Sequence, residues 1–160
     1  MLDRLQFRVE GRWTAERRGR VGAEKVEHPI DFSAPPEFRG QAGLWTPEHL
    51  FIAAAASCFI TTFRAIAEVS RFDGVALEIS AEGVVEKSEG GYEFTQIILR
   101  PRLTISDEAD RQRGVRLLEK TERSCLVSRS IKSKVTIEPR IEIAGTQDVP
   151  LGIQLVETQS

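Results

Sequence analysis

The first fifty residues predict short strands followed by an extended loop. Residues 5–13 alternate apolar and polar side chains, as a strand with one buried face does. A charged turn follows at residues 16–19, and the chain returns from Val21 as a second strand. Three prolines flank or interrupt residues 30–38. Because proline cannot donate a ladder hydrogen bond, we expect a rigid loop there rather than a strand.

The clearest signal in the chain is a long apolar helix. Thr46 suits the N-cap, Pro47 the first helical position, and Glu48 places an acid in the first turn. Residues 50–63 carry no charge, which predicts a helix to about Ser70 that is buried on every side. A bilayer span needs about 20 apolar residues, so we interpret this segment as a core helix.

The second half of the chain predicts a hairpin, a helix and a last strand. Residues 75–88 and 92–105 alternate around a Gly-Gly turn. A second helix, with acids at its start, occupies residues 106–124, and residues 134–143 alternate again. The order strand-strand-helix-strand-strand-helix-strand predicts an α+β fold in which an antiparallel sheet packs on the buried central helix.

Composition supports one domain and limits the classes of partner that the chain can be expected to bind. Of the 160 residues, we expect 1–145 to form a single domain and assign no structure to the tail, 146–160. The 22 Lys and Arg against 24 Asp and Glu give a net charge of −2, so nothing favours nucleic acid or an anionic membrane as partner. Two Cys and two His fill no usual zinc site, and we expect neither metal nor cofactor. Scarce cysteines and the lack of an export signal indicate the cytoplasm.

The two cysteines are the candidate reactive groups. Cys58 lies in the apolar helix and Cys125 just past the second helix, and each alone is typical of a small buried hydrophobe. Together they can reduce a peroxide, since one thiolate can become a sulfenic acid that the other thiol closes into a disulfide. A cation lowers the pKa of the first thiol, and Arg17 and Arg18 are available. Taken by themselves, these arginines are typical of a solvent-exposed charged turn that keeps the protein soluble. Glu48 by itself is typical of an acid that interacts with the helix dipole.

A longer motif surrounds the first cysteine. Residues 38–59 contain a Gly-rich loop, Thr-Pro-Glu, and an Ala-rich helix with Ser-Cys-Phe, the cysteine standing ten residues after Glu48. This segment resembles the signature of the OsmC/Ohr family, the osmotically inducible and organic-hydroperoxide-resistance proteins. Cys125 with Leu-Val-Ser behind it is similar to the family's second cysteine, although Leu126 stands where proline is common. We read the chain as a divergent OsmC-like branch.

The resemblance implies a thiol peroxidase that acts on organic hydroperoxides and is regenerated by a dithiol reductant. By motif, Cys58 matches the peroxidatic thiol, Cys125 the resolving thiol, and Glu48 the acid that holds an activating arginine. The candidates for that arginine are Arg17 first, with Arg18 and Arg39 as alternatives. The family also implies an intertwined homodimer with its active sites at the interface.

Helix geometry gives a separate reason to expect a dimer. Ten helical residues separate Glu48 and Cys58 by about 15 Å along the axis and roughly 80° around it, so they cannot meet on one straight helix. A second copy of the helix, crossing at the small residues 53–57, can bring Glu48 of one chain toward Cys58 of the other.

Two rival functions remain open at this point. The chain can be a binding module for an apolar or acyl ligand, in which Cys58 only packs. It can also be a hydrolase or thioesterase with the thiol as nucleophile. The second rival lacks a base, because neither His28 nor His49 has an evident link to Cys58.

Overall fold

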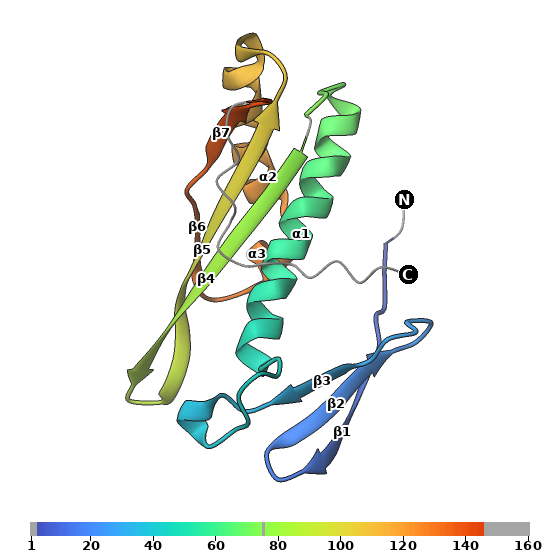
Figure 1. The fold of residues 1–160 in the computed structure, drawn as a ribbon, viewed down its shortest axis with the longest axis vertical. Coiled ribbons are helices and arrows are strands. Elements are labelled where there is room, and N and C mark those ends of the chain that lie inside the picture. Colours follow the sequence, from blue (N-terminus) through green and yellow to red (C-terminus); the bar gives the residue numbers. More distant parts are fainter. Residues whose placement is uncertain (1–2, 75, 146–160) are drawn as a thin grey trace. The chain divides into compact units, whose positions relative to one another are not determined.

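A computed structural model describes residues 3–74 and 76–145, and their contacts divide them into two units, 3–51 and 52–145 (Figure 1). The fold class is α+β, as predicted. The predicted tail, 146–160, lies outside the described residues. The expectation of a single domain over 1–145 stays a prediction.

The first unit is built on a three-stranded antiparallel sheet of order β1-β2-β3. Its strands are β1 (Val9–Ala15), β2 (Arg18–Ala23) and β3 (Ile30–Ser33). The expectation of a loop in place of β3 was wrong, since this strand pairs with β2 from Val21↔Ile30 to Arg18↔Ser33. The strand fits between the prolines, so all four of its residues keep an N–H. The next two prolines introduce the short 3₁₀ helix η1 (Pro36–Phe38).

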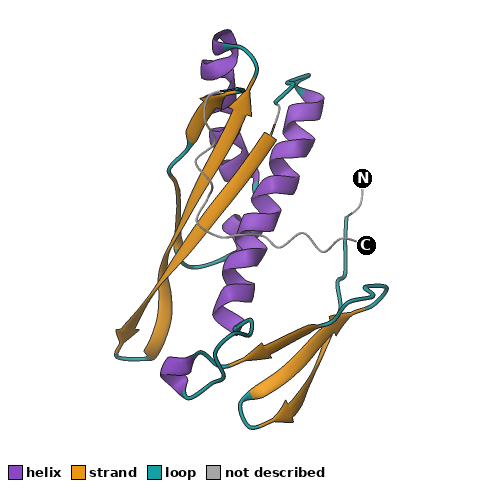
Figure 2. Cartoon of the chain, in the orientation of Figure 1, coloured by secondary structure: helices purple, strands orange, loops and turns teal. Residues whose placement is uncertain are grey.

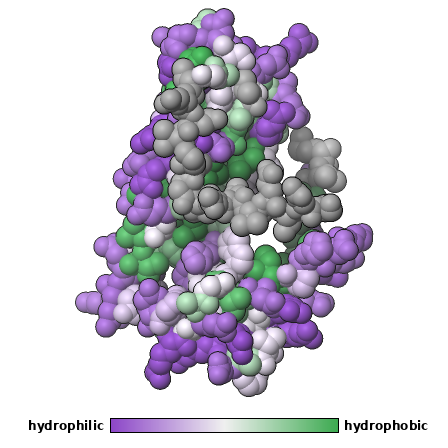
Figure 3. Space-filling model, viewed as in Figure 1, coloured by the Kyte–Doolittle hydropathy of each residue, from purple (hydrophilic) through white to green (hydrophobic). Residues whose placement is uncertain are grey.

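The two faces of this sheet differ in polarity. Strand register places Arg12, Arg20 and Asp31 on one face, where Arg20 Nε donates to Asp31 at 2.6 Å. The opposite face carries apolar side chains, and two of them stay exposed: Val9 at 68% and Trp13 at 77%. Trp13 is therefore no core residue of this chain. On the face drawn in Figure 3, apolar patches interrupt a mainly hydrophilic surface.

The predicted helix is α1 (Pro47–Val69), and its start is capped as expected. The Thr46 hydroxyl accepts from the His49 N–H at 3.2 Å, while the Thr46 N–H donates to His49 Nδ1 at 3.3 Å. This reciprocal pair is a capping box in which histidine replaces the usual Glu or Gln. Local sequence therefore fixes where the helix begins.

The burial predicted for α1 is only partly correct. One stripe is buried in the single chain, consisting of Ala55, Phe59, Phe63 and Ala67. The residues on the other side, among them Ala54 and Ser57, are exposed, so burial on every side was wrong for one chain. By length and composition alone the helix is apolar enough to cross a membrane, and 22% of its most apolar window is buried.

The second unit contains a larger mixed sheet (Figure 2). A long antiparallel hairpin joins β4 (Ala76–Ser88) to β5 (Gly91–Ile105). The single strand expected at the end of the chain is divided into β6 (Lys134–Ile137) and β7 (Arg140–Ile143), both parallel to β5. Pro139, which has no N–H to donate, stands between them.

Two helices cover the apolar face of this sheet. α2 (Arg111–Ser124) follows the 3₁₀ turn η2 (Glu108–Asp110). A backbone N–H in the first turn of η2 donates a hydrogen bond to the Asp107 carboxylate. Gly114 lets α2 approach closely, because a Cβ there would lie 3.0 Å from Leu103 of β5. The fully buried side chains of the core come from the sheet, α1 and α2: Phe59, Ile97, Leu99, Leu103, Ile105 and Leu118.

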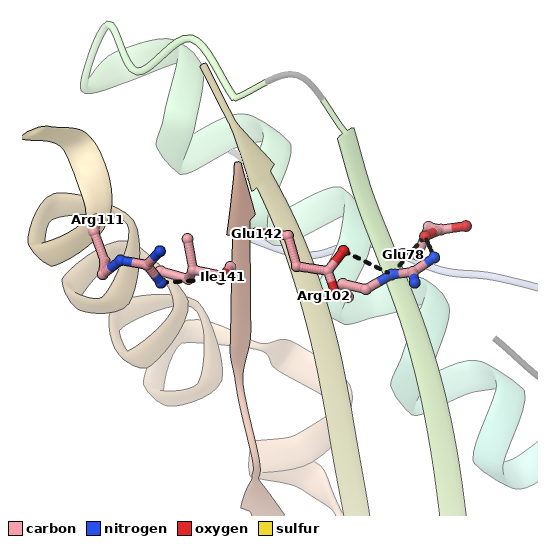
Figure 4. A network of polar contacts seen from close by, with 5 residues as sticks. All are labelled: Glu78, Arg102, Arg111, Ile141 and Glu142. Atoms are coloured by element: carbon pink, nitrogen blue, oxygen red, sulfur yellow. Dashed lines mark hydrogen bonds and ion pairs between the residues drawn. The ribbon is translucent and has the colours of Figure 1, made fainter. Parts of the chain in front are cut away.

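Ion pairs tie the strands of this sheet together (Figure 4). Arg102 of β5 is 8% exposed and lies between Glu78 of β4 and Glu142 of β7, with Nε 2.9 Å from the Glu78 carboxylate. At the start of α2, Arg111 donates to the carbonyl of Ile141 at 2.9 Å. These contacts join β7 to β5 and the start of α2 to β7.

Candidate functional site

The structure brings the two predicted cysteines together within the second unit. Cys58 is half-buried on α1, and Cys125 is completely buried after the end of α2. Both are free thiols, and they are close enough for the Cys125 thiol to donate a hydrogen bond to the sulfur of Cys58. The structure therefore brings the two sulfur atoms together, and their reactivity stays a prediction.

Cys125 occupies the junction between two helices. Its N–H still bonds to the Thr121 carbonyl at 2.9 Å, but its own backbone is extended, so α2 ends there. The next residue begins α3 (Leu126–Ser130), for which Cys125 is the N-cap. The first N–H groups of a helix have no partner within it, so those of Leu126 and Val127 are available to another acceptor.

The surroundings of Cys58 favour its thiolate. Burial by itself raises the pKa of this thiol, but hydrogen bonds from the Val127 N–H, the Cys125 thiol, the Thr62 hydroxyl and the Leu126 N–H outweigh it. The net effect lowers the pKa of Cys58 below its ordinary value. Thr62 Oγ1 lies 3.8 Å from the Cys58 sulfur, one helical turn along α1.

The second thiol is shifted in the opposite direction. Burial raises the pKa of Cys125, and the neighbouring sulfur of Cys58 raises it further. The hydroxyl and N–H of Ser128 act against this rise without cancelling it. The arrangement therefore places a thiol of lowered pKa, Cys58, beside a thiol of raised pKa, Cys125.

The predicted acid and arginines all belong to the first unit. Arg17 donates to the Phe38 carbonyl at 2.7 Å, and Arg18 to the Gln41 side chain at 3.0 Å. Within residues 3–74 and 76–145, three buried side-chain atoms lack a hydrogen-bond partner, and two of them belong to groups of opposite charge in the first unit, Arg18 Nε and Glu48 Oε2.

The third candidate, Arg39, ends η1 in a left-handed conformation with φ 60°. None of the groups that lower the pKa of Cys58 is an arginine, so the activating charge stays a prediction.

Sequence reasoning missed the groups that surround the sulfur of Cys58. Thr62 was readable, because a residue four positions along a helix lies beside the first. The N–H groups of Leu126 and Val127 carry no side-chain signal, and only a helix start at Cys125 would have revealed them. No cluster of three or more His, Cys, Asp and Glu that suits a metal occurs in the described part of the chain.

Comparison with known proteins identifies the family. Residues 40–140 match the family described as OsmC-like protein. The chain belongs to the OsmC-like family. The uncharacterized protein YmaD of Bacillus subtilis is 28% identical over 144 residues, which span 87% of this chain and 96% of YmaD.

Solved OsmC-like structures share the fold. The protein VCA0330 of Vibrio cholerae superposes with a TM-score of 0.76 at 19% identity, over 85% of this chain and 99% of its own. The organic hydroperoxide resistance protein OsmC of Legionella pneumophila gives a TM-score of 0.70 at 22% identity, over 86% and 96%. At these identities the likeness establishes the fold alone.

Proposed function

We propose that this OsmC-like protein is a thiol peroxidase that reduces organic hydroperoxides through a disulfide between Cys58 and Cys125. The observation that carries the proposal is the pair of adjacent free thiols whose pKa values shift in opposite directions. A peroxidase needs one thiolate to attack and a second thiol that reacts afterwards, and this pair supplies both.

The reaction proceeds in three balanced steps. The Cys58 thiolate attacks the outer oxygen of ROOH, forming an S–O bond as the O–O bond breaks, and RO⁻ takes up a proton and leaves as the alcohol. Sulfur is thereby oxidised to the sulfenic acid. The Cys125 sulfur then attacks the Cys58 sulfur, the S–O bond breaks, and water leaves with the proton from the Cys125 thiol. A dithiol reductant exchanges with the disulfide and restores both thiols.

A homodimer completes the proposed site. Glu48 and an arginine, Arg17 or Arg18, form the charged pair that approaches Cys58 from the second copy. Three features support this: the unpartnered buried atoms of Arg18 and Glu48, the small exposed residues of α1, and the exposed apolar face of the first sheet. Sedimentation velocity tests it, because a stable active monomer would contradict the shared site.

The proposed substrate is a bulky organic hydroperoxide and the proposed setting is the cytoplasm. Apolar side chains of α1 flank Cys58, and such a surface favours binding of alkyl hydroperoxides over hydrogen peroxide. Two proteins of similar fold agree with this class, since the Legionella protein and OhrB of Bacillus subtilis are both called organic hydroperoxide resistance proteins.

Single-cysteine variants test the proposal. Cys58→Ser should abolish consumption of an organic hydroperoxide, because it removes the attacking sulfur. Cys125→Ser should consume one equivalent and stop at a sulfenic acid that dimedone traps, because no second thiol closes the disulfide. Consumption by Cys58→Ser at the wild-type rate would rule out the assigned roles.

A further inference from the structure

His49 closes the start of α1 through a single acceptor atom. The Thr46 N–H donates to His49 Nδ1 at 3.3 Å, and the His49 N–H donates to Thr46 Oγ1 at 3.2 Å. An imidazole nitrogen accepts a hydrogen bond only when it carries no proton. The imidazole of His49 is therefore neutral in this capping box, with its ring proton on Nε2.

Glu48 lies inside the capping box. Thr46 is the N-cap and His49 the third helical residue, so Glu48 stands between them as the second. The two hydrogen bonds of the box thus fix the backbone on both sides of Glu48. Its Oε2 is buried and has no hydrogen-bond partner in the part of the chain that the structure describes. The position of this carboxylate therefore depends on a closed box.

The two partners in the box differ in their access to water. Thr46 is 4% exposed, and the preceding carbonyl, that of Trp45, accepts from the Ser33 N–H of β3 at 2.8 Å. His49 is exposed, and Trp45 contacts it edge-on with ring centroids 6.2 Å apart. A proton from solvent therefore reaches the imidazole, whereas little water reaches the Thr46 N–H to replace a lost acceptor.

The charged side chains around the helix start do not form an ion pair with His49 among the described residues. Asp31 of β3 is held in an ion pair on the polar face of the first sheet, and Arg17 and Arg18 donate to uncharged oxygens. Glu48 leaves the helix about 100° away from His49 around the axis. No carboxylate therefore stands ready to bind a protonated imidazole in place of Thr46.

Protonation of His49 breaks one of the two hydrogen bonds of the box. The protonated Nδ1 can donate to the Thr46 hydroxyl, 3.2 Å away, but it repels the Thr46 N–H. A buried N–H that loses its acceptor destabilises the arrangement that buries it, so the first turn of α1 loosens. Since an imidazole ordinarily changes its charge between about pH 5 and pH 8, the box opens as the pH falls through that range.

We propose that His49 is a positioning residue for Glu48, which holds the carboxylate in place at neutral pH and releases it as the pH falls. This inference rests on the proposed peroxidase function, in which Glu48 belongs to the charged pair beside Cys58, and adds a regulation by pH. Glutamine accepts the same hydrogen bond and takes up no proton in this range. The box should therefore stay closed at every pH in His49→Gln.

Hydrogen exchange of the Thr46 amide tests the box without any substrate. In the wild-type protein its protection factor should fall by at least about threefold between about pH 7.5 and about pH 5.5. In His49→Gln the protection factor should stay constant. His28→Gln is the matched control, because it removes the other histidine of the chain, which is exposed between β2 and β3, and it should behave as the wild type. A wild-type protection factor that does not change with pH would overturn the proposal.

The pH dependence of peroxide consumption tests the positioning of Glu48. Because protonation of Cys58 slows both proteins as the pH falls, the readout is the ratio of the wild-type rate to the His49→Gln rate. This ratio should be near one at about pH 7.5 and should fall by about three- to tenfold at about pH 5.5. A constant ratio would refute the positioning role while the peroxidase function stands. Absence of peroxide consumption in both proteins at every pH would instead refute the peroxidase function, and the Thr46 amide would still decide whether His49 opens the box.

Discussion

Replacing Thr62 with valine tests how the protein stabilises the Cys58 thiolate. Valine keeps the shape of threonine and removes the hydroxyl whose oxygen lies 3.8 Å from the sulfur. A hydrogen bond of this kind contributes roughly 0.5–1 kcal/mol, and its loss leaves the backbone N–H groups and the Cys125 thiol in place. The pKa of Cys58 should therefore rise, and its alkylation at neutral pH should slow by about two- to fivefold.

The assay is the rate of iodoacetamide alkylation of Cys58 as a function of pH, followed by mass spectrometry in the Cys125→Ser background. In Thr62→Val the whole rate curve should move to higher pH. Thr95→Val is the matched control, because its hydroxyl bonds to the Val84 carbonyl in the remote sheet. A Thr62→Val curve that coincides with the control would refute the hydroxyl's part in thiolate stabilisation.

Three further predictions concern the second thiol, the activating charge and the core. Ser128→Ala removes a hydroxyl that lowers the pKa of Cys125, so disulfide closure should slow and the sulfenic acid should be trapped by dimedone for longer. Arg17→Ala and Arg18→Ala should differ in peroxide consumption, with the larger loss at the arginine that forms the charged pair with Glu48; wild-type rates in both variants would contradict this role. Leu118→Ala empties a fully buried position and should lower the free energy of unfolding by about 2–5 kcal/mol in urea titrations.

Local signals in the sequence were sufficient for much of the fold. The cap, the proline and the acid at Thr46, Pro47 and Glu48 predicted the start of α1, and the Gly-Gly turn predicted the β4–β5 hairpin. β3 was not predicted, because prolines lie on both sides of it and it has only four residues. The parallel pairing of β6 and β7 depends on contacts with β5 far away in sequence, which alternation does not reveal.

The candidate site was predictable only in part. The two cysteines could be identified by their scarcity and by the motif around Cys58, and the structure places them in contact. The backbone donors at the start of α3 could not be identified from the sequence. Every residue except proline has an N–H, and only the fold decides which N–H groups lie beside a sulfur. Burial on every side of α1 was inferred from its apolar composition. In the single chain, however, the other elements cover only one stripe of the helix.

The most direct test of the peroxidase function is the fate of the two thiols after one equivalent of an organic hydroperoxide. The reduced protein is treated with cumene hydroperoxide, its remaining thiols are alkylated, and its peptides are mapped without reduction. We expect loss of both thiols and a peptide pair joined through Cys58 and Cys125, which a dithiol converts back to two free thiols. Two unmodified thiols after the peroxide, under conditions where the fold is intact, would contradict the peroxidase function.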